Sequence, residues 1–521
     1  MPKPHHAAPP PPPPPPISIL PPRLCPLATA VLALLSLLLA TALWVLLVLS
    51  PSQSPTAHAA LSDAADWAFA AATAGGEGGG GEASSSSSSP LSLGHIVFGI
   101  AGSAQLWPRR REYVRLWWDP SAMRGHVWLD AGAPPAAPGP SAPGDGGSLP
   151  PIRVSEDTSR FRYTNPTGHP SGLRIARIAA EAVRLVGVGG GGARWVVLVD
   201  DDTVVSADNL VAVLGKYDWR EMVYVGAPSE SHSANTYFSH GMAFGGGGVA
   251  LSFPLATALA RTLDVCIERY PRLYGSDDRL HACITELGVP LSREYGFHQW
   301  DIRGNAHGIL AAHPIAPFIS IHHLELVDPI YPGLNSLESL ELFTKAMKTD
   351  SMSFLQRSIC YDKRQKLTYA VSLGYVIQVY PNVLLPRELE RSERTYIAYN
   401  RMSQRTEFDF DTKDVQKSLC KKPILFFLRD VWKDGNITRG SYIRSSVRDD
   451  LKNKVFCFRS PPLPDIDEIQ VSASPLSKTW HLVCSNIPNN ISYLVSTYAF
   501  ANYHFIVHTA DIGTKKVMQC A

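Results

Sequence analysis

The sequence predicts an α/β domain with a mostly parallel central sheet. Apolar runs of strand length alternate with helical periodicity between residues 95 and 226, as in chains whose parallel strands are joined by helices. One run, Trp195–Val199, is apolar at every position, which is typical of a strand covered on both faces. Three aspartates follow this run directly, at the strand end where α/β sheets open their ligand sites.

The individual elements follow from the spacing of their apolar residues. Strands are expected at 95–102, 126–130, 195–199 and 222–226. The segment 173–186 places its apolar side chains on one helical face. Asp208 is expected to cap a short helix that begins near Asn209.

The overall charge gives no reason to expect a nucleic-acid partner. Lysine and arginine total 48 and aspartate and glutamate total 46 in 521 residues, so the formal net charge is +2. Nucleic-acid-binding domains are usually strongly basic. The basic triplet Arg109, Arg110 and Arg111 is therefore expected to be a solvated surface.

The N-terminal part predicts a single transmembrane helix. Residues 27–49 contain no charged side chain, and at about 1.5 Å per residue they span a hydrocarbon core of roughly 30 Å. Lys3 and Arg23 precede this segment, and the next basic residue is Arg109, so the positive-inside rule places the proline-rich tail 1–26 in the cytosol. A cleaved signal peptide is the alternative, although its apolar region is normally shorter and nearer the start.

The composition beyond the anchor indicates a lumenal chain. Residues 50–93 are rich in alanine, glycine and serine and predict a flexible stem. Seven cysteines and two glycosylation triplets, at Asn436 and Asn490, follow, as expected in an oxidising secretory compartment. Because seven is odd, at least one thiol is expected to be free or paired with another chain.

The main domain is expected to span 94–350, with a disordered insert at 131–151 that is rich in proline, glycine and alanine. From 351 to 521 the pattern changes to strands separated by turns, and five of the seven cysteines lie there. Strands are expected at 367–380, 423–431, 467–474 and 480–485. The sequence thus predicts a smaller, β-rich C-terminal region held by disulfides.

Asp200 and Asp202 follow a buried strand at positions i and i+2, so both carboxylates can turn toward one cation. Such oxygen ligands suit Mg²⁺ or Mn²⁺, which often bind substrate phosphates at the same time. This pattern favours a nucleotide-diphosphate site. Two alternatives stay open: an aspartate-rich turn that caps the next helix, and a haloacid-dehalogenase phosphatase motif with Asp200 as nucleophile, which usually follows the first strand of its domain.

A second acidic pair, Asp277 and Asp278, lies in the first turn of a predicted helix that Ser276 caps and Gly288 ends. The helix dipole there favours an ionised carboxylate, which suits a general base. The local sequence alone favours a simpler interpretation, in which the two acids only stabilise the helix end.

Glycines and histidines complete the candidate set. The segment 240–252 contains four consecutive glycines, which allow a tight turn or a close approach of backbone to a ligand. The alternation in 318–328 predicts a strand, so His322 and His323 are expected to point to opposite faces, with at most one reaching a metal. His298 is a further candidate, although a lone histidine is more often structural.

Together, these segments resemble the plant Fringe-related glycosyltransferases, a domain-of-unknown-function group (number 604) akin to animal Fringe and to the β-1,3-galactosyltransferases of glycosyltransferase family 31. The resemblance rests on "FGIAGSAQLWPRRREYVRLWW", "SEDTSRFRYTNPTGHPSGLRIARI", "WVVLVDDDTVV", "SESHSANTYFSHGMAFGGGGVALS", "LYGSDDRLHACITELGVPLSREYGFHQWDIRGNAHG" and "ISIHHLELVDPIYP". The order and spacing of these segments are specific, and the dense part of the match covers about residues 94–335.

The resemblance implies a GT-A-type nucleotide-sugar-binding fold for residues 94–350, a UDP-sugar donor, Mn²⁺ or Mg²⁺ as cofactor, and inversion at the anomeric carbon. By position, Asp202 becomes the most direct metal ligand, together with Asp200. His322 is preferred to His298 as the histidine ligand.

The same resemblance implies that Asp278 is the catalytic base, with Asp277 beside it. The residues expected to contact the nucleotide-sugar are Asp200, Asp201, Gly246, Gly247 and Arg174. Cys266 and Cys283 are expected to form a disulfide beside the catalytic helix.

The leading hypothesis is an inverting, metal-dependent transferase that moves a sugar from a UDP-sugar to a hydroxyl of a glycan or glycoprotein, with a β-1,3 linkage. A Golgi membrane protein of type II topology with a lumenal catalytic domain is the expected setting. The alternative from another class is a non-catalytic lumenal sugar-binding or scaffold protein that keeps the fold.

Overall fold

The computed structural model describes most of the chain beyond residue 88. The described residues are 89–132, 148–187, 190–362, 364–399, 407–445, 466–477, 503–509 and 515–519. They belong to one compact unit, Ser88–Ala521. No helix among them is both long and apolar enough to cross a bilayer, and the predicted anchor at 27–49 lies outside them, as do most of the predicted stem and insert.

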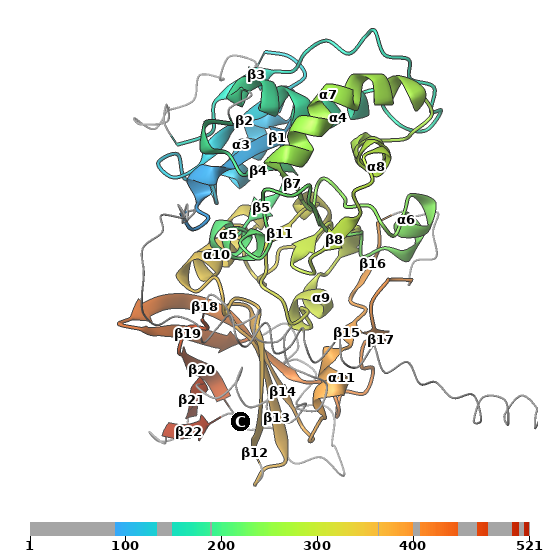
Figure 1. Cartoon of the computed structure of the whole chain (residues 1–521). Helices are drawn as coiled ribbons and strands as arrows, with labels where there is room; N and C mark the ends of the chain where they lie inside the picture. Colours follow the sequence, from blue (N-terminus) through green and yellow to red (C-terminus); the bar gives the residue numbers. More distant parts are fainter. Residues whose placement is uncertain are drawn as a thin grey trace, which may run out of the picture. The chain divides into compact units, whose positions relative to one another are not determined.

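A seven-stranded sheet positions the site, and its strands lie in the order β3-β2-β1-β4-β7-β6-β8 (Figure 1). The strands are β1 (Ile96–Ala101), β2 (Arg124–Leu129), β3 (Ile152–Val154), β4 (Trp195–Asp200), β6 (Tyr224–Gly226), β7 (Val249–Ser252) and β8 (Leu291–Arg293). Four of the six neighbouring pairs are parallel, whereas β7 is antiparallel to β4 and β6. The α/β class is confirmed, and this mixed sheet with a parallel core fits a GT-A-like fold.

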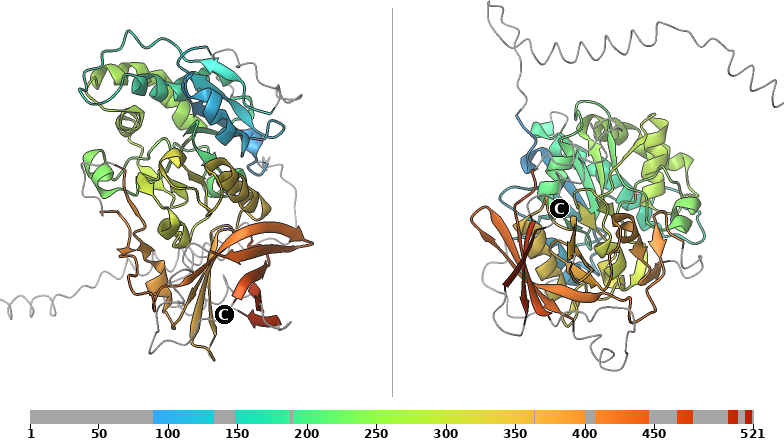
Figure 2. Two further views of the ribbon diagram at one scale, coloured as in Figure 1. Left: turned by 180° about the vertical axis from the view of Figure 1, so that it is seen from behind. Right: turned by 90° about the horizontal axis from the view of Figure 1, so that it is seen from below.

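Helices cover both faces of this sheet. They are α3 (Trp107–Arg115), α4 (Ser171–Val186), α5 (Ala207–Leu214), α7 (Phe253–Arg269) and α8 (Ser276–Glu286). Val197 and Val199 of β4 belong to the core cluster that includes residues of α3 and α5, and Val196 and Leu198 belong to the one that includes residues of α4 and α7. Figures 1 and 2 show the helices around the sheet. Because successive residues of β4 enter two different cores, the strand is apolar at every position.

Two helix starts differ from the expectation by one or two residues. Ser206, not Asp208, is the N-cap residue of α5, and Asp208 lies in the first turn. The N-cap of α8 is Gly275, so Ser276 is the first helical residue. The carboxylate of Asp278 accepts the Gly275 amide at 2.9 Å, which closes this helix end.

A small three-stranded sheet, in the order β5-β11-β9, lies beside the carboxyl edge of the large sheet. Its strands are β5 (Val204–Val205), β9 (Phe297–His298) and β11 (Ser320–Ile321). β11 is antiparallel to β5 and parallel to β9, so three segments distant in sequence meet directly after the aspartates.

The C-terminal region contains an eight-stranded antiparallel sheet, in the order β12-β13-β14-β18-β19-β20-β21-β22 (Figure 2). The strands are β12 (Arg357–Asp362), β13 (Leu367–Ser372), β14 (Val376–Tyr380), β18 (Ile424–Asp434), β19 (Ile437–Arg444), β20 (Ile466–Ala473), β21 (Tyr503–Thr509) and β22 (Lys515–Gln519). The segment predicted as one strand at 367–380 is a hairpin that turns at Gly374, where φ is 77°. The predicted strand 480–485 lies outside the described residues.

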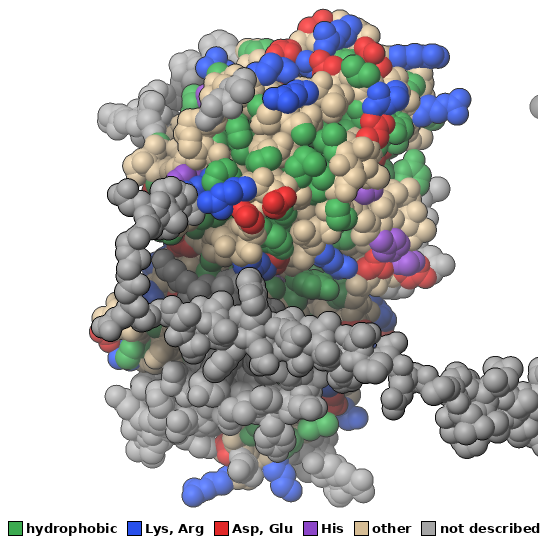
Figure 3. All heavy atoms as spheres, viewed as in Figure 1, with side chains coloured by type: hydrophobic (Ala, Val, Ile, Leu, Met, Phe, Trp, Pro, Cys, Tyr) green, Lys and Arg blue, Asp and Glu red, His purple; other side chains and the backbone are tan. Residues whose placement is uncertain are grey.

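The remaining helices and strands lie between these elements along the chain. They are α6 (His232–Tyr237), β10 (Ile302–Gly304), α9 (His307–Ala311), α10 (Ser336–Thr349), α11 (Pro386–Glu390), β15 (Ser392–Glu393), β16 (Tyr396–Ala398) and β17 (Thr412–Lys413). β10 pairs with β16, so the C-terminal region returns to the α/β part. On the face shown in Figure 3, basic and acidic side chains of the described residues are interspersed.

Candidate active site

The three aspartates end β4 at the carboxyl edge of the parallel core. Ala101 of β1 lies opposite Asp200, and its carbonyl accepts the Asp201 amide at 2.8 Å. Asp201 and Asp202 are buried, with 1% and 3% exposure, whereas one third of the Asp200 side chain is exposed. Carboxylates in such an environment need cations, donors or protons nearby.

His322 reaches these aspartates through the small sheet. Ile321 of β11 lies opposite Val204 of β5, so the next residue, His322, lies alongside the segment that carries Asp202. Its Nε2 atom is 3.1 Å from Asp202 Oδ1 and 3.5 Å from Asp200 Oδ2. One ligand atom from each of these three side chains lies within 4.8 Å of the other two.

His298, the other histidine candidate, is not part of this cluster. It is buried, with Nδ1 3.1 Å from Glu230 Oε1 and Nε2 3.0 Å from His313 Nε2. Both ring nitrogens are therefore engaged away from the aspartates. Of the four predicted metal ligands, the structure brings together Asp200, Asp202 and His322.

The expectation that His322 and His323 point to opposite faces is wrong. β11 ends at Ile321, and His323 has a left-handed backbone with φ of 56°, which is incompatible with a continuing strand. The two rings instead pack together with centroids 3.9 Å apart, and His323 stacks on Tyr399 at 4.8 Å. His322 alone of the two joins the aspartate cluster.

The expectation that the basic triplet is a solvated surface is wrong for Arg110. Its guanidinium lies 2.9 Å from Asp201 Oδ1, 3.0 Å from Asp202 Oδ2 and 3.1 Å from Glu325 Oε2. The Arg110 side chain is 19% exposed, against 66% for Arg109. Sequence reasoning missed Arg110 and Glu325, because a run of three arginines does not show which one turns inward.

The surroundings shift the pKa values of the three carboxyl groups in different directions. Burial opposes the ionisation of Asp202, but the neighbouring His322 and Arg110 outweigh it and lower the pKa of Asp202 to about 2. Burial, with repulsion from Asp202 and Asp277, raises the pKa of Asp200 well above its usual value. Burial also raises the pKa of Asp201 to about 6, against its hydrogen bond with Arg110. A bound divalent cation would favour ionisation of all three.

The donor set fits a divalent cation. Asp202 Oδ1 is buried and accepts no hydrogen bond from a described residue, although it faces His322. Two carboxylates and one imidazole suit Mn²⁺ better than Mg²⁺, which prefers oxygen ligands throughout. Arg110 binds the other oxygen of Asp202 and so orients this carboxylate, as the outer partners of metal ligands commonly do.

The predicted glycine turn lies directly against the site. A Cβ on Gly246 would lie 2.2 Å from the His322 ring, and one on Gly245 would lie 2.6 Å from Asp277 Oδ1. The Gly246 carbonyl accepts the Thr203 hydroxyl at 2.7 Å. Glycine is needed here because any side chain would displace the ring or the carboxylate.

Gly247 and Arg174 shape the same edge of the sheet. The Gly247 amide donates to Gln299 Oε1 at 2.7 Å. Arg174 is buried on α4 and donates to the carbonyls of Trp128 at 3.0 Å and Gly102 at 2.8 Å, where β2 and β1 end. Their contact with a nucleotide-sugar stays a prediction.

The two acids of α8 face different partners. Asp278 Oδ1 accepts the Gly275 amide at 2.9 Å, and Oδ2 accepts the Tyr274 amide at 2.6 Å. Asp277 Oδ1 instead accepts the Ser276 hydroxyl at 3.0 Å. Asp277 also lines, with Asp200, Gly245 and mainly apolar residues, a cavity of about 20 Å³, which is room for about one water. Burial raises the pKa of Asp277 to about 6, and it also raises the pKa of Asp278.

The predicted disulfide between Cys266 and Cys283 is present and joins α7 to α8. It fixes the helix whose first turn carries Asp277. In the C-terminal region, Cys360 and Cys420 each belong to a disulfide as well.

Two family models match the chain. One, described as "Fringe-like", matches residues 158–303 and includes the aspartates, the glycine turn and the start of α8. The other, described as "Protein of unknown function, DUF604", matches residues 234–486 and continues through His322 into the C-terminal sheet.

A "Beta-1,3-glucosyltransferase" of Mus musculus is 32% identical over 105 residues, which is 20% of this chain and 20% of that protein. The chain thus matches about a fifth of the length of this curated relative. Among solved structures, a glycosyltransferase involved in the glycosylation of the major capsid of PBCV-1 aligns with 47% of this chain and 96% of its own, at 10% identity and a TM-score of 0.24. The two overlapping family matches and the glucosyltransferase relative show that the chain is similar to the Fringe-related glycosyltransferases.

Proposed function

We propose that the chain is an inverting, metal-dependent glycosyltransferase that moves a sugar from a UDP-sugar to a hydroxyl of a glycan or glycoprotein. The observation that carries the proposal is the meeting of Asp200, Asp202 and His322 at the carboxyl edge of the sheet, with Asp277 lining the cavity next to Asp200. The uridine nucleotide and the β-1,3 linkage rest on the similarity to this family and on the name of the mouse relative.

Asp200, Asp202 and His322 would hold Mn²⁺, with Mg²⁺ as the second choice. When bound, the cation neutralises the charge that develops on the diphosphate as the sugar leaves. Arg110 keeps Asp202 oriented toward the cluster, and Gly246 leaves room for the His322 ring. The partial exposure of the Asp200 side chain supports entry of the donor diphosphate from this side.

Asp277 is assigned as the base and Asp278 as a positioning residue. Both oxygens of Asp278 accept backbone amides, whereas Asp277 accepts the Ser276 hydroxyl on Oδ1 and lines a water-sized cavity with Asp200. The ionised Asp277 takes the proton of the acceptor hydroxyl while that oxygen attacks the anomeric carbon. The bond to the diphosphate breaks on the opposite side, so the configuration inverts.

A type II membrane protein of the Golgi, with the described unit in the lumen, is the proposed setting. The uncharged segment 27–49 and the disulfides support it. Asn436 supports it as well, because it is exposed at the tip of the β18–β19 hairpin, where a glycosylation enzyme has access.

The other two hypotheses differ in what they require. A haloacid-dehalogenase phosphatase is disfavoured by the family matches and by the position of the aspartates after β4 rather than after a first strand. A non-catalytic lumenal protein would keep the fold without transferring sugar, so only a measurement of activity separates it from the transferase.

The test uses the full chain with Mn²⁺ and a panel of UDP-sugars, and it measures UDP release with and without glycan acceptors. Release with at least one donor, abolished in Asp202→Asn and retained in Asp208→Asn, is the expected result, because Asp208 is an exposed acid outside the cluster. Absence of both UDP-sugar binding and turnover would favour the scaffold hypothesis instead.

A further inference from the structure

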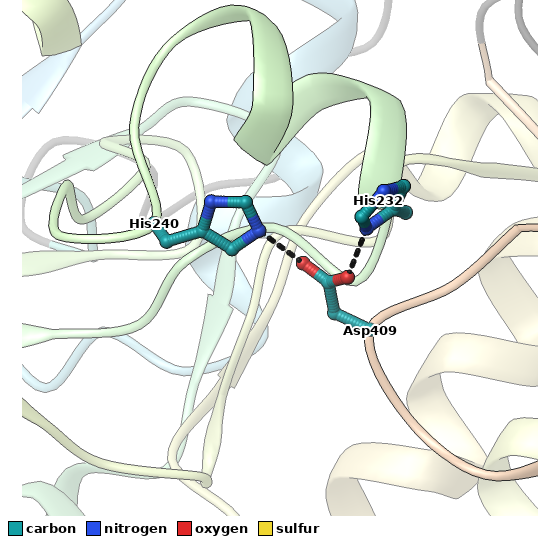
Figure 4. A group of neighbouring side chains, drawn as sticks. All are labelled: His232, His240 and Asp409. Atoms are coloured by element: carbon teal, nitrogen blue, oxygen red, sulfur yellow. Dashed lines mark hydrogen bonds and ion pairs between the residues drawn. The ribbon is translucent and has the colours of Figure 1, made fainter. Parts of the chain in front are cut away.

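Asp200, Asp202 and His322 are called the catalytic cluster below. A second group of side chains that can bind a metal lies outside it, where α6 meets the C-terminal region. His232 is the first residue of α6, His240 follows the helix, and Asp409 comes from the segment 407–411. Figure 4 shows the two imidazoles turned toward the Asp409 carboxylate from either side.

The geometry is that of converging ligands. His232 Nδ1 lies 2.5 Å from Asp409 Oδ1, and His240 Nε2 lies 3.3 Å from Asp409 Oδ2. One ligand atom from each of the three lies within 4.8 Å of the other two. The side chains of His232 and His240 are 45% and 60% exposed, so water can complete the coordination and an ion can enter.

The carboxylate is held in place by buried groups. Asn235 is 1% exposed, and its amide nitrogen donates to Asp409 Oδ2 at 2.6 Å. The Asp409 amide donates to the Glu230 carbonyl at 3.1 Å, next to the isolated bridge between Ser231 and Phe408. Such outer contacts are typical of metal ligands, because they fix the orientation of the donor atoms before an ion binds.

We propose that His232, His240 and Asp409 form a second metal site for a divalent cation of the Zn²⁺ class. Two imidazoles and one carboxylate suit Zn²⁺ rather than Mg²⁺ or Mn²⁺, which the oxygen-rich catalytic cluster prefers. The site differs from the catalytic cluster in every ligand, so its failure would leave the proposed transferase function unaffected.

The consequence of binding is mechanical. The ion joins the segment 407–411 to residues 232–240, which lead directly into the glycine turn at 245–248 that packs on His322 and Asp277. Phe238 lies in this connection, and its ring packs on Phe244 and Tyr274 at 5.8 Å and 5.6 Å. Zinc at this site would therefore link the segment 407–411 of the C-terminal region to the segment that leads into the glycine turn beside the catalytic cluster.

The test is a zinc titration of the full chain after removal of metals by a chelator, with a chromophoric zinc indicator as competitor. The double variant Asp202→Asn/His322→Gln lacks the catalytic cluster and is expected to retain one zinc site of unchanged affinity. Adding His240→Gln to it is expected to weaken zinc binding at least tenfold. His169→Gln, an exposed histidine outside both clusters, is the matched control and should change nothing.

The unfolding midpoint, measured with and without zinc, shows whether a loss of zinc binding comes from a loss of folding. His240 is the most exposed of the three ligands, so His240→Gln should keep the unfolding midpoint of the metal-free chain. Zinc should raise that midpoint in the double variant but not after His240→Gln is added. Unchanged zinc affinity in the triple variant, or no zinc binding by the double variant, would overturn the proposal.

Discussion

Arg110 and Asp202 form an ion pair, with Nη2 3.0 Å from Oδ2, that joins α3 to the cluster of Asp200, Asp202 and His322. The same guanidinium binds Asp201 Oδ1 at 2.9 Å, so one cation serves two adjacent buried carboxylates. The ion pair stabilises the folded state as well as orienting Asp202, because a buried carboxylate without a counter-charge lowers the free energy of unfolding. It connects residues that are about ninety positions apart in the sequence.

Arg110→Gln is expected to lower the free energy of unfolding by about 3 kcal/mol, because it leaves Asp201 and Asp202 without this cation. Arg109→Gln is the matched control, since this 66% exposed side chain pairs with Glu325 at the surface and should matter by less than about 1 kcal/mol. Urea unfolding of the two variants measures the difference. Equal, small losses would show that the Arg110 contacts are no stronger than those of a surface ion pair.

His322→Gln is expected to weaken Mn²⁺ binding at least about tenfold and to reduce transfer in proportion, because one of three ligand atoms is lost. Asp208→Asn removes an acid of the neighbouring helix without touching the cluster and should leave both unchanged. The signal of free Mn²⁺ in electron paramagnetic resonance gives the affinity. Unchanged Mn²⁺ affinity in His322→Gln would remove this histidine from the ligand set.

Asp277→Asn is expected to lower kcat by about 100-fold or more, with little change in stability, because it removes the base and keeps the shape. Asp278→Asn should act mainly on stability, by about 1 kcal/mol, since its carboxylate holds the amides of Tyr274 and Gly275. Steady-state kinetics and urea unfolding of both variants separate the two roles. The reverse pattern would return the role of base to Asp278.

The pH profile gives an independent check on Asp277. Burial raises the pKa of Asp277 to about 6, above its usual value, and a base must be ionised to act. Activity should therefore rise with pH up to about 6 and then level, and bound Mn²⁺ can only shift this limb to lower pH. If the residual activity of Asp277→Asn still rises with pH up to about 6, a group other than Asp277 causes that rise.

Gly246→Ala is expected to displace His322, because the added Cβ would lie 2.2 Å from its ring. The overpacking should cost about 1–3 kcal/mol of stability and weaken Mn²⁺ binding. Gly241→Ala is the control, since the nearest atom to its Cβ would be Ser239 Oγ at 3.5 Å. Thermal unfolding and Mn²⁺ titration of both variants make the comparison. A tolerated alanine at 246 would mean that the turn shifts freely.

Asn436→Gln is expected to remove one glycan from the chain expressed in a eukaryotic secretory pathway. Asn436 is exposed in the hairpin turn after Gly435, so the acceptor amide is accessible once the sheet has formed. Electrophoretic mobility before and after glycosidase treatment measures the loss. Absence of any glycan on Asn436 in the wild-type chain would count against the proposed lumenal orientation.

The sequence by itself determined the α/β class and the place of the aspartates. The apolar run Trp195–Val199 has no polar face, so it must be covered on both sides, and the acids that follow it must lie at a strand end. The order of motifs also identified His322, Gly246 and the acid pair of α8. These features are local or belong to family patterns, so they can be read without a three-dimensional structure.

Only the tertiary structure decided which side chains meet. The register of β11 on β5 places His322 rather than His298 beside Asp202, and a left-handed residue at His323 breaks the expected alternation. The selection of Arg110 from three arginines and the meeting of His232 with Asp409 depend on packing between distant segments. Such contacts depend on how elements that are distant in the sequence pack together, so the residues around each side chain in the sequence do not predict them.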